Sequence, residues 1–232
     1  MKKRQLKNTD FIVSGSQWTL EKWVEFGADK KYIQALPYPI NLSLFKPRGG
    51  EYTKSKKNLL WLGRITPRKR LDLLLDSFIL LMKERRDIYL KIIGHFPYAK
   101  GYKKLIESFP FLDHIEYKES ISYSEVPKIM QDIDILIQPS ENENFASSPA
   151  EALCCGVPVI IGPLNGTKDY INPHSIVFED YTAEALKKAI VSLLKNLESN
   201  SAQISAEARK TAEYHFDVRH IADEIEKIFL RL

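Results

Sequence analysis

The sequence predicts an α/β fold in which a parallel β-sheet is flanked by helices. From Asn58 onward, short apolar runs alternate with amphipathic stretches of roughly 10–16 residues. A pair of neighbouring parallel strands needs a crossover of that length, which is usually a helix. Of the 232 residues, 44% are hydrophobic and 28% are charged, which allows a real core and excludes the disordered and coiled-coil classes. The length predicts one full domain and a smaller additional part.

The first part of the chain, residues 1–36, predicts a single strand and a single helix. An apolar run at 11–13 predicts the strand, and the helix behind it stops at Gly27, because glycine commonly ends helices. Prolines and glycines then recur through residues 37–57, which predicts an irregular linker. Three tryptophans at apolar positions are expected in the core, namely Trp18, Trp23 and Trp61.

The main domain is expected over residues 58–200. Its helices are marked by apolar side chains every three or four residues, or by a capping box such as Ser122 with Glu125. Its strands are short apolar runs, expected at 59–62, 89–93, 114–117, 133–137 and 158–161. Its helices are expected at 70–85, 99–107, 122–131, 148–155 and, capped by Thr182, 182–197. The C-terminal part, residues 201–232, should add helices at 203–214 and 218–230 that pack back across the gap to the first part.

The segments that follow the strands are the places to look for chemistry. In a doubly wound sheet, ligands bind beyond the carboxyl ends of the strands. Candidate binding residues are therefore expected in five segments: Gly63-Arg64, Gly94-His95, Lys118-Glu119, residues 140–148 and residues 162–166.

A cluster of cations follows the first strand of the main domain. Arg64, Arg68, Lys69 and Arg70 place four positive charges within seven residues. Arginine forks and a lysine point charge together suit a diphosphate, so the cluster predicts a phosphate site at the mouth of the crevice. A solvated basic loop is the alternative, because most runs of charge are simply exposed.

Residues 140–152 predict a loop and then a helix whose first N–H groups point back at that loop. Pro149 suits the first helical position and Ser148 suits the cap. The free N–H groups at such a helix start attract anions. Glu143 in the loop and Glu151 in the first turn have seven residues between them, so each carboxylate could face a different hydroxylated ring. Glu151 also fits a capping box with Ser148, and both interpretations stay open.

Other features exclude several classes of protein. The net charge of +4 is too small to indicate binding to nucleic acid. Cys154 and Cys155 are adjacent, which fits neither a zinc pair nor a disulfide framework and favours reduced thiols. Asp132-Ile133-Asp134 mimics a metal motif, but a lone pair of carboxylates is thin ligation, so no metal is expected. His95 is interpreted as a surface histidine, with a ligand contact as the alternative.

Taken together and in their order, these motifs resemble one family. They are Gly63-Arg64 with Lys69, Pro139-Ser140, Glu143-Asn144-Phe145 through Glu151-Ala152, and Cys155-Gly156-Val157-Pro158-Val159. The set resembles the nucleotide-sugar-binding, Rossmann-like half of retaining GT-B glycosyltransferases. Glu143 and Glu151 match the Glu-x7-Glu motif of glycosyltransferase family 4, and residues 13–18, 37–41 and 45–47 resemble the family's crossover between its two domains. The resemblance implies the C-terminal domain of a GT-B fold, with residues 1–36 as a remnant of the N-terminal domain.

The resemblance also implies roles for individual residues. Arg64 and Lys69 would hold the donor pyrophosphate and stabilise the leaving nucleoside diphosphate. Glu143 would contact the hydroxyls of the donor sugar, with these three residues forming the catalytic set, and Glu151 would bind the ribose hydroxyls. The further donor-binding residues are Gly63, Gly94, which would permit close approach of the ligand, the backbone near Lys118, which would meet the base, and the loop residues Asn144, Phe145, Ala146 and Ser147.

The sequence departs from the family pattern at several positions. The family often has glycine where this chain has Arg70, Asn144 and Ala146, and Asp169 replaces a common glutamate. The largest departure is that the chain supplies only the last strand and helix of the first domain. The resemblance therefore implies a hexosyltransferase of the family 4 type that is incomplete as a single chain, with a second chain as a possible source of the N-terminal domain.

The expected function is transfer of a sugar, with retention, from a nucleoside diphosphate sugar to a glycan or glycolipid acceptor in surface polysaccharide biosynthesis, with no cofactor. A non-catalytic nucleotide-sugar-binding subunit or truncated domain is the alternative. A GT-B-like sugar-nucleotide epimerase is a third option, against which the Glu-x7-Glu spacing argues. No apolar stretch suggests a membrane span or a signal peptide, so a cytoplasmic location is expected. Peripheral contact with the inner face of the membrane stays open through Lys2, Lys3, Arg4 and Lys7.

Overall fold

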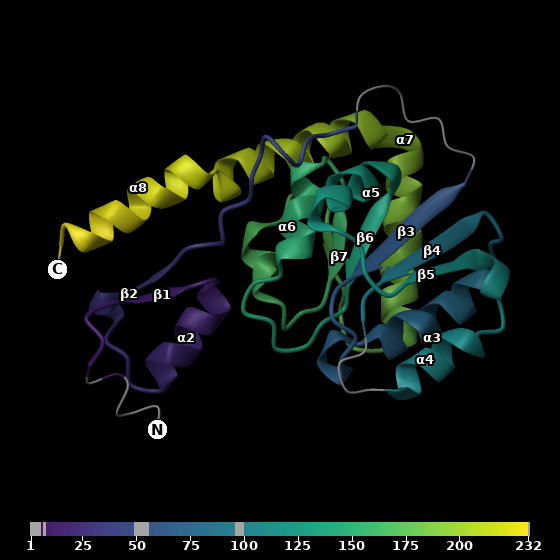
Figure 1. Ribbon diagram of the computed structural model, residues 1–232, viewed down its shortest axis with the longest axis horizontal. Helices are drawn as coiled ribbons and strands as arrows, with labels where there is room; N and C mark the ends of the chain where they lie inside the picture. Colours follow the sequence, from purple (N-terminus) through teal and green to yellow (C-terminus); the bar gives the residue numbers. More distant parts are fainter. Residues whose placement is uncertain (1–5, 7, 49–55, 96–99, 232) are drawn as a thin grey trace.

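The computed structural model describes residues 6, 8–48, 56–95 and 100–231, which form two parts of unequal size (Figure 1). The larger part contains a six-stranded sheet in the order β5-β4-β3-β6-β7-β8, and every pair of neighbouring strands is parallel. The strands are β3 (Lys57–Leu62), β4 (Ile88–Ile93), β5 (Ile115–Lys118), β6 (Ile135–Gln138), β7 (Val159–Ile161) and β8 (Ile176–Val177). The predicted parallel α/β fold is confirmed.

Helices alternate with these strands along the chain. They are α3 (Leu71–Met82), α4 (Lys100–Glu107), α5 (Val126–Asp132), α6 (Ser147–Cys154), α7 (Ala183–Phe216) and α8 (Val218–Phe229). Short 3-10 turns also occur, among them η2 (Pro67–Lys69), η4 (Tyr123–Glu125) and η5 (Gly166–Tyr170). The chain runs outward from β3 to β5 on one side, returns to β6, and runs outward again to β8. This reversal makes the boundary between β3 and β6 a topological switch point.

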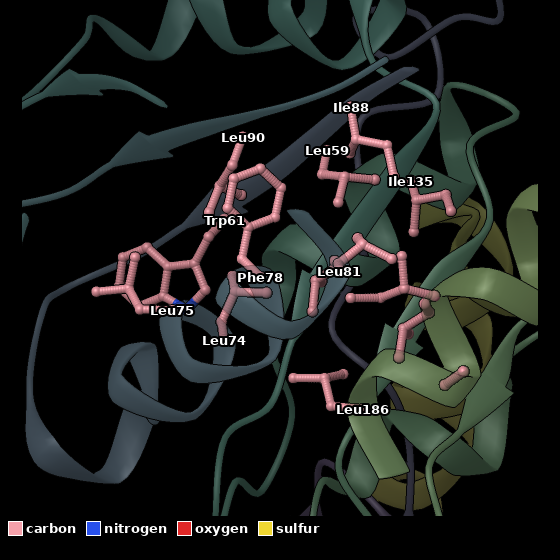
Figure 2. Close-up of a cluster of buried hydrophobic side chains, with 14 of the residues drawn as sticks. Leu59, Trp61, Leu74, Leu75, Phe78, Leu81, Ile88, Leu90, Ile135 and Leu186 are labelled. Carbon is pink, nitrogen blue, oxygen red and sulfur yellow. The ribbon is translucent and has the colours of Figure 1, made fainter. Parts of the chain in front are cut away.

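One face of the sheet is covered by α3 and the first half of α7. Successive residues of a strand point to opposite faces, so alternate side chains of β3 and β4 share this side. Leu59, Trp61 and Leu90 pack with Phe78 of α3 and Leu186 of α7 in one cluster, and all five are at most 1% exposed (Figure 2). Each such side chain contributes about 1.5–3 kcal/mol by leaving water. This cluster fixes β3, the strand that leads into the site.

The opposite face is covered by α5, α6 and the second half of α7. Leu60 and Leu136 of the sheet belong to a cluster with Met130 and Phe216. Helix α7 serves both faces because it bends at Asn200, whose φ of −134° and ψ of 25° are not helical. The sequence predicted separate helices at 182–197 and 203–214, and the structure joins them across this bend.

The smaller part consists of β1 (Ile12–Ser14), α2 (Gln17–Glu25) and β2 (Ile33–Ala35), with β1 and β2 paired in parallel. Strand β2 was not predicted, because three residues carry too little hydrophobic pattern. Helix α2 has no buried residue, and Trp18 and Trp23 are only partly buried. The prediction that they lie in the core is therefore wrong, whereas Trp61 is fully buried. A short helix on two short strands leaves no room for a closed core.

The ends of the predicted elements shift by a few residues. Strand β6 begins at Ile135 rather than 133, and α3 ends at Met82 rather than 85. The capping box of Ser122 with Glu125 is present, and Thr182 caps α7 by accepting a hydrogen bond from the Ala185 N–H, as predicted. Strand β8 has only two residues and was missed for the same reason as β2.

Candidate functional site

Two loops meet at the switch point, where β3 and β6 end side by side. Strand β3 runs through Gly63 into η2, and β6 runs into the loop at 139–146 that leads to α6. The N–H of Glu141 donates to the carbonyl of Arg68 at 2.9 Å, which joins the two loops directly. The fold therefore brings together the cation cluster and the acidic loop, which are about 75 residues apart in the sequence.

The cations of η2 bind a glutamate of the facing loop. The Nζ atom of Lys69 lies 2.6 Å from Oε2 of Glu143, and Nη1 of Arg68 lies 2.9 Å from the same oxygen. The side chains of Lys69 and Glu143 are only 14% and 12% exposed. Water screens such a pair less than it screens a surface ion pair, so the attraction between the charges is stronger.

Arg64 and Arg68 are placed differently from each other. Arg64 follows Gly63, is exposed, and forms neither a hydrogen bond nor an ion pair within the residues that the structure describes. Its guanidinium is thus available to an anion at the mouth of the site. Arg68 is the arginine that binds Glu143. The sequence analysis did not predict this contact, because it identified Arg68 only as one member of the cation cluster.

The backbone of Glu143 is fixed by the loop that follows β7. The N–H of Glu143 donates to the carbonyl of Leu164 at 3.0 Å, and the N–H of Gly166 donates to the carbonyl of Glu143 at 2.8 Å. A Cβ at Gly166 would lie 2.1 Å from the carbonyl oxygen of Asn144 and 2.2 Å from the hydroxyl of Ser16. Only glycine fits there, so the approach of the two loops that hold Glu143 depends on it.

Asn144 and Phe145 connect this site to the smaller part. The side chain of Asn144 donates to the Tyr38 hydroxyl and accepts from the Ser16 hydroxyl, both at 3.4 Å. The ring of Phe145 lies 5.0 Å from that of Tyr38 and 5.8 Å from that of Phe216. The asparagine that replaces a frequent glycine is therefore turned toward the smaller part.

Helix α6 begins at Ser147, and its N-cap is Ala146, which has no side chain to cap with. The N–H of Ala146 is satisfied by the Thr167 hydroxyl at 2.8 Å. The Ser148 hydroxyl instead donates to the side-chain carbonyl of Gln138 at 3.0 Å. The predicted cap and capping box at Ser148 are wrong, because the buried amide at the end of β6 takes the hydroxyl that would have served.

Glu151 is 7% exposed within α6. Burial raises the pKa of its carboxyl to about 7, and a hydrogen bond with the Tyr123 hydroxyl opposes this shift only in part. Tyr123 lies in η4, in the loop behind β5. The carboxyl can therefore change its charge near neutral pH, and it links α6 to the loop beside the end of β5.

Gly94 and Lys118 occupy the neighbouring strand ends. A Cβ at Gly94 would lie 1.9 Å from the carbonyl oxygen of Gly63, so the fold itself requires glycine there. The Cβ position of Gly94 thus faces the backbone at the end of β3, and the approach of a ligand to this glycine stays a prediction. Lys118 is exposed, and its ammonium pairs with Glu116 at 3.2 Å.

Several other residues singled out by the sequence have structural positions. Asp134 is 2% exposed and accepts a hydrogen bond from the Asn58 N–H at 2.6 Å, which fastens the beginnings of β6 and β3. Cys154 and Cys155 are buried free thiols, and burial raises the pKa of both. His95 is exposed. Within the described ranges, no group of three or more histidine, cysteine or acidic side chains is arranged to hold a metal ion.

A cavity of about 760 Å³ lies away from this site. It is lined by the linker, the turn at 155–158 and the bend of α7, at the amino ends of the strands. Folds of this type bind ligands at the other end. Among the helices in the described ranges, none combines the length and apolar character that crossing a bilayer requires. The residues on which membrane contact was predicted lie outside the described residues: Lys2, Lys3, Arg4 and Lys7.

Known proteins share this sequence pattern. The family model described as "Glycosyl transferases group 1" matches residues 46–211. An uncharacterized glycosyltransferase of Methanocaldococcus jannaschii is 31% identical over 144 residues, which cover 60% of this chain and 38% of that protein. A GDP-mannose-dependent monoacylated alpha-(1-6)-phosphatidylinositol monomannoside mannosyltransferase of Corynebacterium glutamicum is 23% identical over 232 residues, covering 90% of this chain and 59% of that protein.

Solved structures share the fold. A glycosyltransferase of Rickettsia africae superposes with a TM-score of 0.84 at 21% identity, covering 98% of this chain and 65% of that chain. Anabaena HepE in complex with UDP and glucose superposes with a TM-score of 0.82 at 17% identity, covering 97% and 64%. The chain thus spans 38–59% of the two relatives and just under two thirds of these solved chains.

The buried carboxyl of Glu151 predicts a pH dependence of stability. Its pKa is about 7 in the folded chain against 4.5 for an ordinary glutamate, so the folded state binds the proton more tightly. The stability that the protonated Glu151 carboxyl contributes is therefore fully present below pH 4.5. The free energy of unfolding falls by about 3 kcal/mol as the pH rises from there through 7. Glu151→Gln cannot ionise and should gain about that much relative to the natural chain between pH 5 and pH 8 in urea unfolding. Glu184 in α7, which is exposed, gives the matched control. Glu184→Gln should change the free energy of unfolding by the same amount at pH 5 and at pH 8. An equal effect of Glu151→Gln at the two pH values would contradict the raised pKa.

Proposed function

Because the chain belongs to the group 1 glycosyl transferases, we propose that it is the donor-binding half of a retaining GT-B transferase. The reaction would move a hexosyl group from a nucleoside diphosphate sugar to a glycan or glycolipid acceptor. The observation that carries the proposal is the convergence of η2 and the loop at 139–146 at the switch point, where Lys69 and Arg68 meet Glu143.

The cations of η2 suit the leaving group of such a reaction. Transfer breaks the bond between the anomeric carbon and the diphosphate oxygen, and the electron pair stays on the diphosphate. Negative charge therefore grows on that group in the transition state, and fixed cations stabilise it. Arg64 is exposed at the mouth, and Lys69 is held in place by Glu143. We assign these two cations to the diphosphate.

The two glutamates suit the two sugar rings of the donor. Glu143 sits beside the cations with its backbone fixed on both sides, so its carboxylate is preorganised to accept hydrogen bonds from the hydroxyls of the transferred sugar. Glu151 lies further along α6 and is linked to the loop behind β5 through Tyr123. We assign Glu151 to the ribose, and the backbone of the four residues before α6 and at its start to the sugar and phosphates: Asn144, Phe145, Ala146 and Ser147.

The relatives support a nucleotide-sugar donor. The name of the corynebacterial relative specifies GDP-mannose, and the Anabaena structure holds UDP and glucose. We therefore infer a UDP- or GDP-linked hexose as donor, with no cofactor, and a family 4 type enzyme of surface polysaccharide biosynthesis. The buried thiols of Cys154 and Cys155 fit the reducing cytoplasm, where we place the protein, in contact with the inner face of the membrane.

The smaller part supports the need for a further domain. Within the described residues its sheet has only two strands, α2 has no buried residue, and Val13, Phe26 and Tyr32 are 45–49% exposed. A sheet of this size needs more strands or helices to be stable. We infer that the segment 1–36 completes an N-terminal α/β domain, supplied by a second chain or a longer one, which also holds the acceptor. Helix α8 spans the gap between the two parts (Figure 1). The side-chain amide of Gln34 in β2 donates a hydrogen bond to the carboxylate of Glu224 in α8.

Binding of the donor tests the role of Glu143. The chain should bind UDP-glucose or GDP-mannose more tightly than UDP or GDP in titration calorimetry. Glu143→Gln should lower the ratio of nucleotide-sugar affinity to nucleotide affinity by about tenfold, because charged hydrogen bonds to the sugar are lost. Binding of the bare nucleotide should stay unchanged or improve, since Lys69 loses its internal partner. Equal losses for nucleotide and nucleotide sugar would contradict the assignment, and no binding of either sugar nucleotide by the folded chain would contradict the proposed function.

Lys69→Met should weaken binding of the bare nucleoside diphosphate by at least tenfold, because a charge-assisted contact disappears. The measurement is calorimetry with UDP and GDP. Lys188 of α7 provides the control, since its side chain is 72% exposed and it forms an ion pair with Glu179, away from the site. Lys188→Met should leave affinity unchanged. An unaltered affinity in the Lys69 variant would remove this lysine from the site.

Turnover separates the transferase from the alternative of a non-catalytic, nucleotide-sugar-binding subunit. Residues 1–232 by themselves should bind donor but transfer no measurable sugar, because the smaller part has too little packed structure to hold an acceptor. Addition of an α/β chain encoded beside it should restore transfer if the complex is the enzyme. Donor binding without transfer in that complex would favour the non-catalytic subunit.

A further inference from the structure

Two adjacent cations bind two different glutamates: Lys69, the last residue of η2, and Arg70, its C-cap. Lys69 binds Glu143, as described above, while Arg70 forms an ion pair with Glu141, two residues earlier in the same loop. The Nε atom of Arg70 also lies 3.1 Å from Asp72 at the start of α3. Arg70 therefore ties the loop at 139–146 to α3 instead of facing the same carboxylate as Lys69.

The backbone of Arg70 shows that this arrangement has a cost. Its φ of 49° and ψ of 43° lie in the left-handed region, which favours glycine over any residue with a Cβ. A glycine would adopt this turn without strain. At this strained position the arginine makes ion pairs that glycine could not make.

Tyr181 completes a brace around the loop. The Arg70 guanidinium lies 5.7 Å from the centre of the Tyr181 ring, within the range of a cation–π contact. The Tyr181 hydroxyl donates to the Ser140 carbonyl at 3.0 Å and accepts from the Leu164 N–H at 3.3 Å. Gly162 leaves room for it, since a Cβ there would lie 2.8 Å from the hydroxyl oxygen.

The brace acts on both sides of Glu143. Ser140 and Glu141 lie just before Glu143 in the chain, and the carbonyl of Leu164 accepts the hydrogen bond of the Glu143 N–H. Arg70 and Tyr181 thus hold the two backbone segments between which Glu143 is fixed. Among the residues that the structure describes, neither side chain forms a hydrogen bond, ion pair or ring contact with Glu143 itself, so any effect on its carboxylate passes through the backbone.

We propose that Arg70 and Tyr181 are positioning residues for the Glu143 carboxylate, and that Arg70 acts on recognition of the donor sugar and not as a ligand of the diphosphate. This inference rests on the proposed function. It separates Arg70 from the other cations of the cluster, which carry the same charge but face the mouth of the site or Glu143.

The test compares the affinities of UDP-glucose with UDP, and of GDP-mannose with GDP, in Arg70→Gly. Glycine fits the left-handed turn, so the variant should fold, which thermal unfolding would verify. The ratio of the affinity for the nucleotide sugar to that for the bare nucleotide should fall by roughly tenfold, which is a typical coupling between residues in one contact network. The affinity for the bare nucleotide should stay within about twofold. Tyr181→Phe should produce a smaller loss of the same kind, because it removes only the hydroxyl.

A double-mutant cycle and a control make the result specific. If Arg70 acts through its ion pair, Glu141→Gln should add little to Arg70→Gly, and Arg70→Lys should recover part of the preference. Arg85 provides the matched control, because it is similarly exposed and pairs with Asp87 and Glu198 far from the site. Arg85→Gly should leave the preference intact.

The possible failures are distinguishable. A natural chain that shows no preference for the nucleotide sugar would overturn the role of Glu143 and the brace together. A natural chain with that preference, which Arg70→Gly retains, would overturn the brace alone. Equal loss of nucleotide and nucleotide-sugar binding would make Arg70 a ligand of the diphosphate and would also overturn the inference.

Discussion

The ion pair between Lys69 and Glu143 is the interaction on which the arrangement of the site depends. It closes the gap between the loops that follow β3 and β6, the two strands at which the sheet reverses its order. Both side chains are nearly buried, so breaking the pair without a substitute would leave a desolvated charge. In the proposed function, a bound diphosphate would bring negative charge to the same cations and would serve as that substitute. The same contact thus holds the two loops together at the place where the proposed function puts the diphosphate.

The surrounding structure holds this contact in place at some cost. Arg70 and Asn142 both adopt left-handed backbone conformations, and Gly94 and Gly166 accept approaches that no side chain would allow. Strained or crowded backbone of this kind tends to gather where function demands a fixed geometry. Behind it, the two hydrophobic clusters on the faces of the sheet consist of buried side chains and supply the rigid support. Helix α7 joins those two clusters by bending at Asn200.

The smaller part is built differently. It has little buried surface of its own, yet it contacts the site through Ser16 and through the N–H of Gln17, which donates to Asp169 at 2.8 Å, while Tyr38 of the linker contacts Asn144. Those contacts reach the loop that carries Glu143 and the turn η5. Movement of the smaller part would therefore reach the backbone around Glu143 first, which is the part of the site proposed to bind the sugar. This connection gives a physical route by which a further domain could influence donor binding.

The sequence by itself determined the parallel α/β fold, the family resemblance and the segments that follow the strands, because hydrophobic period and turn residues are local properties. It also indicated the cation cluster and Glu143, since their spacing is visible in one dimension. Only the tertiary structure decided that Arg68 binds Glu143, that Ser148 serves Gln138 instead of capping α6, and that Gly94 is required by Gly63. Each of these depends on which buried group lies opposite in space. A hydroxyl or a guanidinium can hydrogen-bond to many kinds of group, and the sequence does not say which one it meets. Packing decides which of those groups lies within hydrogen-bond distance.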